Sequence, residues 1–338
     1  MERSEITIDL GAVRRNAETL LAALEGAALW AVVKSDGYGH GAADVAGAAL
    51  GAGATALCVA TVDEGLELRR KYPDARILVM GPTDRRDVPQ AREARLELVV
   101  SGGEIPHGVR VHLKLDTGMG RWGLSELPPP PVEVVGLMSH LATADTDAGF
   151  AERQTERFRE ATDPYSHLTR HLANSAAALR YPAARFDAGR CGIALYGLSP
   201  FGTDPAEEGL EPVLRWTSQL AQVRLLQPGS STGYGRSFLA EQPTWIGIVP
   251  VGYGDGFRRD LTGTEVQVGG ELRRVVGTVS MDALAVELGR ELPLGTPVTI
   301  IGDGVLAERH AEVAETITYE LVCGIETGPE RARRVVLG

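Results

Sequence analysis

Lysine is scarce in this sequence. Among 338 residues there are 34 lysines and arginines, yet only Lys34, Lys71 and Lys114 are lysines. Arginine keeps its charge and cannot form a Schiff base, whereas lysine can lose its proton and act as a nucleophile or base. We therefore expect a retained lysine to mark a place where amine chemistry is needed. Lys71 is the exception, because it stands beside Arg69 and Arg70 in a charged run typical of a solvated surface.

Other absences exclude whole classes of protein. The three cysteines are widely spaced and odd in number, which indicates reduced thiols in a cytoplasmic protein and excludes a disulfide framework. No apolar run reaches membrane-spanning length, and the polar start MERSEITIDL has no signal-peptide core, so we expect no membrane contact. The formal net charge of -11 argues against nucleic-acid binding, and the 7 histidines show no metal-ligand spacing.

The sequence does contain a regular alternation of apolar runs and helical segments. Most of the apolar runs are separated by segments with a helical pattern, such as Asp63–Lys71 and Gly149–Ala161. Repeated alternation of this kind predicts a (β/α)8 barrel of the TIM type. The eight runs are Leu29–Val33, Ala56–Ala60, Ile77–Met80, Leu96–Val100, Val109–Leu115, Val132–Ser139, His167–Leu172 and Arg185–Tyr196.

Two connections are too short or too rich in proline for an ideal barrel. One follows Val100 and consists of eight residues, and the other contains the prolines from Pro128 to Pro131. Parallel strands normally need a crossover of about a dozen residues, and consecutive prolines do not form a helix. We therefore expect the fourth and fifth crossovers to lack their helices. That side of the barrel would then be thin or covered by another subunit.

The pattern changes after Pro200. Short strand-like segments with glycine turns follow, and only Ala307–Thr316 has a helical pattern there. We expect an α/β barrel domain over residues 1–212 and a β-rich domain over residues 213–338, which gives an overall α/β + β fold class.

Lys34 stands at the carboxyl end of the first apolar run. Gly37, Gly39 and Gly41 follow within a few residues and permit a tight turn, after which an alanine-rich helix begins. Barrel enzymes keep their chemistry at the carboxyl ends of the strands. A lysine that only ends a strand and caps a loop is the alternative interpretation.

The stretch AVVKSDGYGHG resembles the cofactor-lysine motif of alanine racemases, and similar matches recur along nearly the whole chain. The resemblance implies a barrel followed by a β-rich domain, pyridoxal 5'-phosphate as cofactor on Lys34, and a homodimer. It also implies an isomerase that interconverts L- and D-alanine in the cytoplasm, where D-alanine is a precursor of the cell wall.

The resemblance assigns cofactor contacts to several barrel residues. Arg190 would face the pyridine nitrogen, where an always-charged donor keeps that nitrogen unprotonated and weakens the ring as an electron sink. A strand arginine paired with a carboxylate is the alternative interpretation. His140 would be the histidine that polarises the catalytic tyrosine, in a relay through Arg190 and His171 towards Asp63. The residues placed around the phosphate are Tyr38, Asn174, Ser175, Gly192 and Ile193.

Racemisation exchanges a proton between the two faces of Cα, so two bases are needed. Lys34 can serve one face. By resemblance Tyr234, between two glycines, is the second base and reaches the site from the partner subunit, and Tyr253 lines the access passage. A tyrosine in a hairpin turn is the alternative interpretation for Tyr234.

Substrate contacts also follow from the resemblance. Arg121 would bind the substrate carboxylate, and Lys114 is often carbamylated in the family to orient that arginine. The backbone amide of Met281 would contact the same carboxylate, and Asp282 follows it as a supporting residue. The chain departs from the family at Ser280, where cysteine is common. No tyrosine could be matched to the one that often completes the phosphate site near the C-terminus.

Other functions remain open at this point. One is a racemase of another or broader range of amino acids, and another is a related decarboxylase, although that class presents a carboxylate to the pyridine nitrogen. A third is a relative that binds the cofactor without catalysing a reaction.

Overall fold

The computed structural model describes residues 3–338, which form two compact units. The barrel unit comprises Gly11–Phe201 and Pro205–Glu211. The sheet unit comprises the described residues up to Leu10, Gly202–Asp204 and Pro212–Gly338. Each unit has its own buried core, so each is described by itself.

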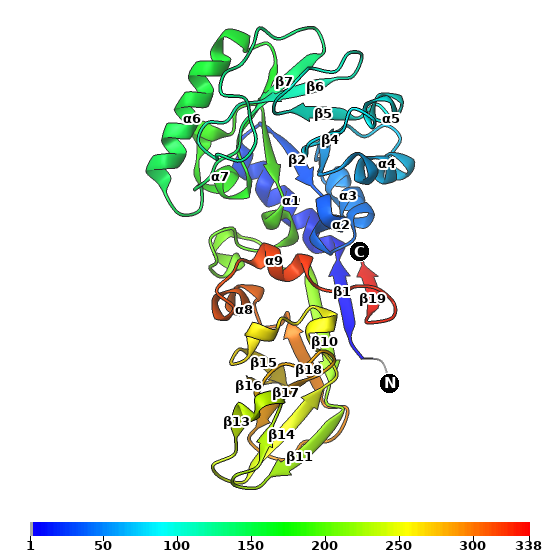
Figure 1. Cartoon of the computed structure of the whole chain (residues 1–338), viewed down its shortest axis with the longest axis vertical. Coiled ribbons are helices and arrows are strands. Elements are labelled where there is room, and N and C mark those ends of the chain that lie inside the picture. Colours follow the sequence, from blue (N-terminus) through cyan, green and yellow to red (C-terminus); the bar gives the residue numbers. More distant parts are fainter. Residues whose placement is uncertain (1–2) are drawn as a thin grey trace. The chain divides into compact units, whose positions relative to one another are not determined.

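The barrel unit is built on eight parallel strands that close on themselves (Figure 1), as the alternation of the sequence predicts. The last strand returns to the first, with Ala28 opposite Ala188 and Trp30 opposite Arg190. The strands are β2 (Ala28–Val32), β3 (Ala56–Val59), β4 (Ile77–Val79), β5 (Glu97–Val100), β6 (Val111–Lys114), β7 (Val134–Met138), β8 (Thr169–His171) and β9 (Ala188–Cys191).

In the barrel unit α1 precedes the first barrel strand, and the other helices follow strands, with two omissions. They are α1 (Leu10–Leu24), α2 (Lys34–Tyr38), α3 (Ala42–Gly51), α4 (Val62–Lys71), α5 (Val88–Glu93), α6 (Ala148–Thr162) and α7 (Ser175–Arg180). Residues 101–110 and 115–133 are all described and contain no helix, which confirms the expectation for the fourth and fifth crossovers. Every residue of β5 and β6 is nevertheless buried. The chain therefore covers this side of the barrel with its own loops.

The sheet unit contains one nine-stranded, mostly antiparallel sheet. The strands run in the order β11 (Gln222–Leu226), β14 (Thr244–Val249), β17 (Leu284–Leu288), β16 (Glu271–Val276), β15 (Glu265–Val268), β18 (Pro297–Ile301), β10 (Leu214–Gln219), β1 (Glu5–Asp9) and β19 (Arg333–Leu337). A small hairpin of β12 (Ser231–Thr232) and β13 (Phe238–Leu239) accompanies it. The helices of this unit are α8 (Ala307–Val313) and α9 (Thr318–Cys323).

The first strand of the chain differs from the expected division of domains. Residues 1–212 were expected to belong to the barrel, whereas β1 pairs antiparallel with β10 and parallel with β19 in the sheet. Ile6 and Ile8 alternate with half-buried neighbours and are fully buried in this sheet. The partners of β1 lie more than 200 residues away in the sequence, so local pattern could not assign the strand. The helix α9 was also not expected.

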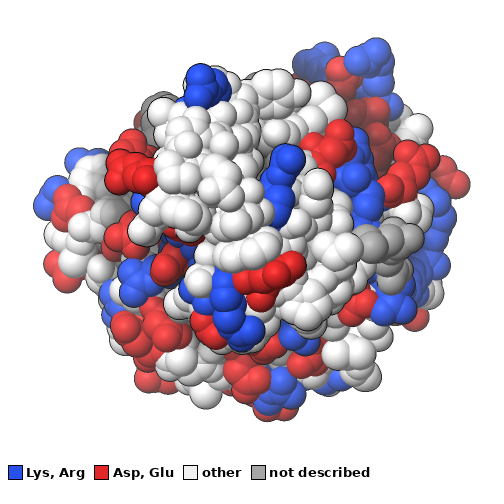
Figure 2. All heavy atoms as spheres, turned by 90° about the horizontal axis from the view of Figure 1, so that it is seen from below, with Lys and Arg blue, Asp and Glu red and all other residues white. Residues whose placement is uncertain are grey.

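The length of the helices and the charge of the surface indicate which partners the protein could contact. None of the helices over residues 3–338 is long and apolar enough to cross a bilayer. On the face drawn in Figure 2, acidic and basic side chains alternate around a broad uncharged area, and no continuous basic patch is seen.

Candidate active site

The turn after β2 holds Lys34 at the start of a left-handed backbone. Lys34 stands just beyond the carboxyl end of the strand and is half-buried. Ser35, Asp36 and Gly37 all have positive φ, at 53°, 49° and 62°. Positive φ at residues other than glycine stores strain and persists only where the surrounding structure holds it. The strained turn therefore coincides with the lysine singled out by the sequence.

Glu64 joins this turn to the start of α4. Its Oε1 accepts a hydrogen bond from the amide of Ser35 at 2.7 Å. Its Oε2 accepts from the amides of Ala60 at 2.6 Å and Thr61 at 3.2 Å. The Thr61 side chain in turn accepts from the amide of Glu64, which completes a capping box. One carboxylate thus holds both the Lys34 turn and a helix N-terminus.

Four of the residues predicted to surround a phosphate meet in the barrel unit. Oγ of Ser175 accepts a hydrogen bond from the amide of Gly192 at 3.1 Å. A Cβ added to Gly192 would lie 2.6 Å from the hydroxyl oxygen of Tyr38, so only glycine lets the tyrosine lie there. Ile193 begins the buried 3-10 turn that follows. We call Tyr38, Ser175, Gly192 and Ile193 the cradle.

Asn174 lies beside the cradle as the N-cap of α7. Its Oδ1 accepts a hydrogen bond from the amide of Ala177 at 3.0 Å. An asparagine before a run of small residues is a preferred cap. It fixes where the helix begins, and with it the position of Ser175.

Arg190, in β9, is buried and held by carbonyl oxygens and imidazoles. Its Nη1 donates to Nδ1 of His171 at 2.8 Å and to the carbonyl of the same residue at 2.7 Å. Its Nη2 donates to the carbonyl of Ser139 at 2.8 Å and lies 3.3 Å from Nδ1 of His140. Nε donates to none of residues 3–338, and no carboxylate bonds to the guanidinium within that range. Burial lowers the pKa of Arg190 to about 10, so it stays charged at neutral pH.

A hydrogen-bonded chain continues from His171 into the barrel. Nε2 of His171 lies 2.8 Å from Nδ1 of His112, and Nε2 of His112 lies 2.9 Å from Oε2 of Glu97. Nε of Arg76 donates to the same carboxylate at 2.8 Å. Burial would raise the pKa of Glu97, but the hydrogen bond from His112 and the charge and hydrogen bond of Arg76 hold it at about 2.

The structure does not bring Asp63 into this hydrogen-bonded chain, although the resemblance implies a relay towards it. Asp63 is exposed in the first turn of α4, where an acidic side chain interacts favourably with the helix dipole and with water. The buried carboxylate is Glu97, reached through His112. Both residues interrupt apolar strands, and a carboxylate in a buried strand needs a partner. That signal in the sequence could have identified them.

Two cations share one aromatic ring beyond β6. Nζ of Lys114 lies 5.8 Å from the ring centroid of Trp122, and Cζ of Arg121 lies 5.4 Å from it. Burial, followed by the charges of Arg121 and Arg190, lowers the pKa of Lys114 to about 8. Burial and the same group of cations also keep the pKa of His140 well below its ordinary value. This concentration of positive charge suits an anionic ligand.

The remaining predicted residues belong to the sheet unit and are exposed there. Tyr234 is 72% exposed, Met281 50% and Tyr253 43%. The carbonyl of Tyr234 accepts a hydrogen bond from Oγ1 of Thr278 at 3.0 Å. The amide of Tyr253 donates to the carbonyl of Ser280 at 3.0 Å, which holds its loop against the segment that contains Met281.

Asp282 supports this segment through ion pairs. Arg331 pairs with it at 2.7 Å and Arg3 at 3.5 Å. Both arginines also pair with the buried Asp255. The segment that follows Met281 is therefore fixed to the two ends of the described chain.

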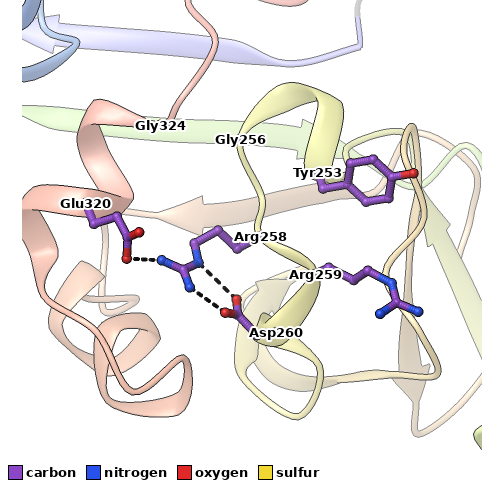
Figure 3. A pocket seen from close by; sticks show the side chains of 7 residues that line it. All are labelled: Tyr253, Gly256, Arg258, Arg259, Asp260, Glu320 and Gly324. Carbon is purple, nitrogen blue, oxygen red and sulfur yellow. Dashed lines mark hydrogen bonds and ion pairs between the residues drawn. The ribbon is translucent and has the colours of Figure 1, made fainter.

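A pocket of about 650 Å³ lies in the sheet unit beside Tyr253. Figure 3 shows Arg258 turned towards Glu320 and Asp260, with which it forms ion pairs. Tyr253 and Arg259 point away from that cluster. Over residues 3–338, no group of three acidic, cysteine or histidine side chains is arranged to hold a metal ion.

Comparisons with known proteins give the family. Models of the alanine racemase N-terminal and C-terminal domains match residues 8–200 and 213–335. The chain belongs to the alanine racemase family. It is 38% identical to the alanine racemase of Lactiplantibacillus plantarum, with 95% of each chain covered. It is also 38% identical to alanine racemase 1 of Bacillus subtilis, with 95% of this chain and 90% of that one covered. The structure of a biosynthetic alanine racemase from Pseudomonas aeruginosa superposes with a TM-score of 0.92 at 35% identity over 100% of both chains.

The alanine racemase match includes every residue predicted for the site. The barrel residues from Lys34 to Ile193 lie within the first matched range, and those from Tyr234 to Asp282 lie within the second. The roles assigned by resemblance therefore concern segments that the family models also align.

Proposed function

We propose that this protein is a pyridoxal-phosphate-dependent alanine racemase that interconverts L- and D-alanine. The observation that carries the proposal is that one barrel unit contains both Lys34, on a strained turn, and a buried Arg190 that bonds through Nη1 and Nη2 and keeps Nε for a ligand. An arginine at the pyridine position disfavours the related decarboxylases, which use a carboxylate there. It suits a reaction that only moves a proton.

The barrel residues fit the cofactor. Lys34 is the amine that would link to its aldehyde, and the cradle would hold its phosphate, with the Tyr38 hydroxyl lying against Gly192 where a Cβ would otherwise stand. Nε of Arg190 would donate to the pyridine nitrogen. When bound, the cofactor makes the Cα–H bond of an amino acid acidic enough to break.

Two bases on opposite faces would then move the proton. Lys34 takes or returns it on one face, and the phenol of Tyr234 does so on the other. Tyr234 is 72% exposed on its own chain. We propose that it acts in the site of a second copy, so that the active enzyme is a homodimer and each site uses both chains.

Substrate binding would rely on the cationic group beyond β6. Arg121 would hold the substrate carboxylate together with the backbone amide of Met281 from the partner chain. The pKa of Lys114, lowered to about 8, favours the neutral amine that reacts with carbon dioxide. A carbamate there would replace repulsion from Arg121 with an ion pair. The product D-alanine would serve as a cell-wall precursor in the cytoplasm.

The test is racemisation of L-alanine by the protein loaded with pyridoxal phosphate, followed by chiral chromatography. We expect D-alanine from the wild type, and a loss of at least about a thousandfold for both Lys34→Ala and Tyr234→Phe, because each removes one base. Serine, lysine and arginine are tested in parallel. If another amino acid racemises and alanine does not, the substrate assignment is wrong.

Mixing the two inactive variants tests the shared site. A heterodimer has one site with both substitutions and one site with neither, so subunit exchange restores activity to about a quarter of the wild-type value. If both variants are inactive and the exchanged mixture also stays inactive, Tyr234 does not act across the dimer.

A further inference from the structure

We propose that Glu97 and His112 are positioning residues that fix the tautomer of His171 and thereby hold the guanidinium of Arg190 in place. The inference rests on the proposed function only for what Arg190 faces. It concerns two residues that the resemblance did not assign to the site.

Arg190 and Glu97 stand at the two ends of the hydrogen-bonded series and set the direction of the bonds between them. Arginine can only donate, so Nδ1 of His171 accepts from Arg190 and its proton must reside on Nε2. That proton points at Nδ1 of His112, 2.8 Å away, which therefore accepts. His112 carries its own proton on Nε2 and donates it to Glu97, an ionised carboxylate that only accepts. One arrangement of protons satisfies the bonds from Arg190 to Glu97; Nη2 of Arg76, 3.4 Å from Nε2 of His112, then faces a second donor and makes no hydrogen bond to it.

The surroundings enforce neutral imidazoles. His112 and His171 are both 0% exposed. Burial lowers the pKa of each ring, and for His171 the nearby charge of Arg190 lowers it further. Both rings therefore stay neutral at neutral pH, and each has one donor and one acceptor nitrogen. A protonated His171 would present an N–H at Nδ1 to Arg190, which can only donate.

Packing holds the rings where these bonds form. The ring of Trp30 lies 4.5 Å from His171 and 5.8 Å from His112 between centroids. Cζ of Arg76 stacks 4.5 Å from the same Trp30 ring. A Cβ added to Gly136 in β7 would lie 2.1 Å from Nδ1 of His112. β7 thus lies between the two strands that carry the histidines and leaves room for them to meet.

Glu97 anchors one end of the hydrogen-bonded series because it also forms ion pairs with two arginines. Arg76 and Arg110 pair with its two oxygens at 2.8 and 3.1 Å. These pairs keep the carboxylate ionised and oriented whatever occurs at Arg190. In a Glu97→Gln variant the hydrogen-bonded series ends in a neutral amide, from which Nε2 of His112 can accept a hydrogen bond. The order of the protons can then reverse, and Nδ1 of His171 presents a hydrogen to Arg190. The guanidinium would have to move.

The experiment compares variants that keep or break the proton order. His112→Leu removes donor and acceptor together, Glu97→Gln removes the obligate acceptor, and His112→Gln keeps one donor and one acceptor. A second histidine–carboxylate pair, between the exposed His107 and the half-buried Glu133, 3.0 Å apart, supplies matched controls as His107→Leu and Glu133→Gln. Nitrogen-15 NMR of the histidine rings in the protein without cofactor reports the tautomer of His171. Chiral assays of the loaded enzyme give kcat and KM.

We expect His171 to be protonated on Nε2 alone in the wild type, in His112→Gln and in both controls. His112→Leu and Glu97→Gln should show protonation on Nδ1. They should also lose about tenfold to a hundredfold in kcat, since a displaced catalytic contact costs that much, with KM changed less than about twofold. The inference is overturned if folded Glu97→Gln and His112→Leu keep both the wild-type tautomer of His171 and the wild-type kcat. It is also overturned if the tautomer of His171 changes while kcat stays at the wild-type value.

Two outcomes separate the inference from the proposed function. If the wild type racemises no amino acid, the proposed function fails, and the His171 tautomer and the affinity for pyridoxal phosphate across the variants still decide the inference. If His112→Leu does not fold, Glu97→Gln and His112→Gln decide it, because both keep the size and polarity of the site.

Discussion

Lys114 is a buried amine whose pKa is lowered by burial and by the charges of Arg121 and Arg190, which outweigh the opposite effect of Asp116. A pKa of about 8 leaves about a tenth of the amine neutral at pH 7, against well under a thousandth for an ordinary lysine. The neutral nitrogen can attack carbon dioxide and release a proton, which leaves a carbamate anion next to Arg121.

We therefore predict that Lys114 is carbamylated in bicarbonate buffer and that the modified fraction rises with pH between 6 and 8. Carbon-13 NMR with labelled bicarbonate measures the adduct, and Lys114→Arg should abolish it. Lys71 provides the comparison, because its amine is half-exposed and paired with Asp44 at 3.3 Å. If the signal persists in Lys114→Arg, the carbamate lies elsewhere, and another anion separates Lys114 from Arg121.

At the residue scale, the sequence predicts roles for groups whose chemistry is local. Lys34 and Gly192 could be singled out because an amine and a missing Cβ have meaning at one position. Glu97 was missed because its role depends on His112, 15 residues away, and on His171, a further 59 residues away. Asp63 was favoured in its place by resemblance alone. Burial, which decides between the two carboxylates, depends on the closed barrel.

At the scale of elements, the Lys34 turn depends on a neighbouring helix. Glu64 accepts three backbone hydrogen bonds that join the turn, the end of β3 and the first residues of α4. The positive φ values of Ser35 and Asp36 are not favoured locally, so they persist because such contacts hold them.

We predict that Glu64→Ala weakens the binding of pyridoxal phosphate about fivefold or more and destabilises the fold by about 1 kcal/mol, the typical value of a lost helix cap. Cofactor titration by absorbance and thermal unfolding measure the two effects. Glu67→Ala, an exposed position on the same helix, is the control and should change neither. Equal effects from both variants would show that α4 as a whole, not the bond to Ser35, matters.

Elements that have a clear pattern of apolar residues, glycines or prolines in their own sequence were predicted, and elements without such a pattern were not. The eight barrel strands and the two missing crossover helices follow from apolar runs, short connections and prolines. α9 is six residues long and ends before a glycine-rich tail, so its pattern is too short to detect. β1 and β19 pair across almost the whole sequence, and no local signal connects them.

At the scale of the whole molecule, three buried histidines and the half-buried His140 make stability depend on pH. His112, His140, His171 and His310 all have pKa values lowered by burial. In the unfolded chain each binds a proton near pH 6.5, whereas in the folded chain it does not until a lower pH. The unfolded state therefore binds more protons below pH 6.5, and stability falls as the pH falls.

We predict that the free energy of unfolding drops between pH 7 and pH 5.5 by up to about 1.4 kcal/mol per pH unit for each neutral histidine. Urea midpoints measured across this range by circular dichroism test it. Replacement of His310, which bonds to Thr264 and to the carbonyl of Ile300, by Gln should reduce the slope by one proton. A flat or rising profile would mean that the buried rings are protonated in the folded protein.

The pairing of β1 with β10 and β19 also has a consequence for synthesis on the ribosome. Arg3 leaves the ribosome 215 residues before its β10 contact, Ser218, and Glu5 leaves 328 residues before Arg333. The barrel is translated in that interval, during which residues 5–9 lack both pairing partners and Ile6 and Ile8 have no sheet in which to be buried. A chain that stops short of β19 therefore lacks the parallel partner of β1.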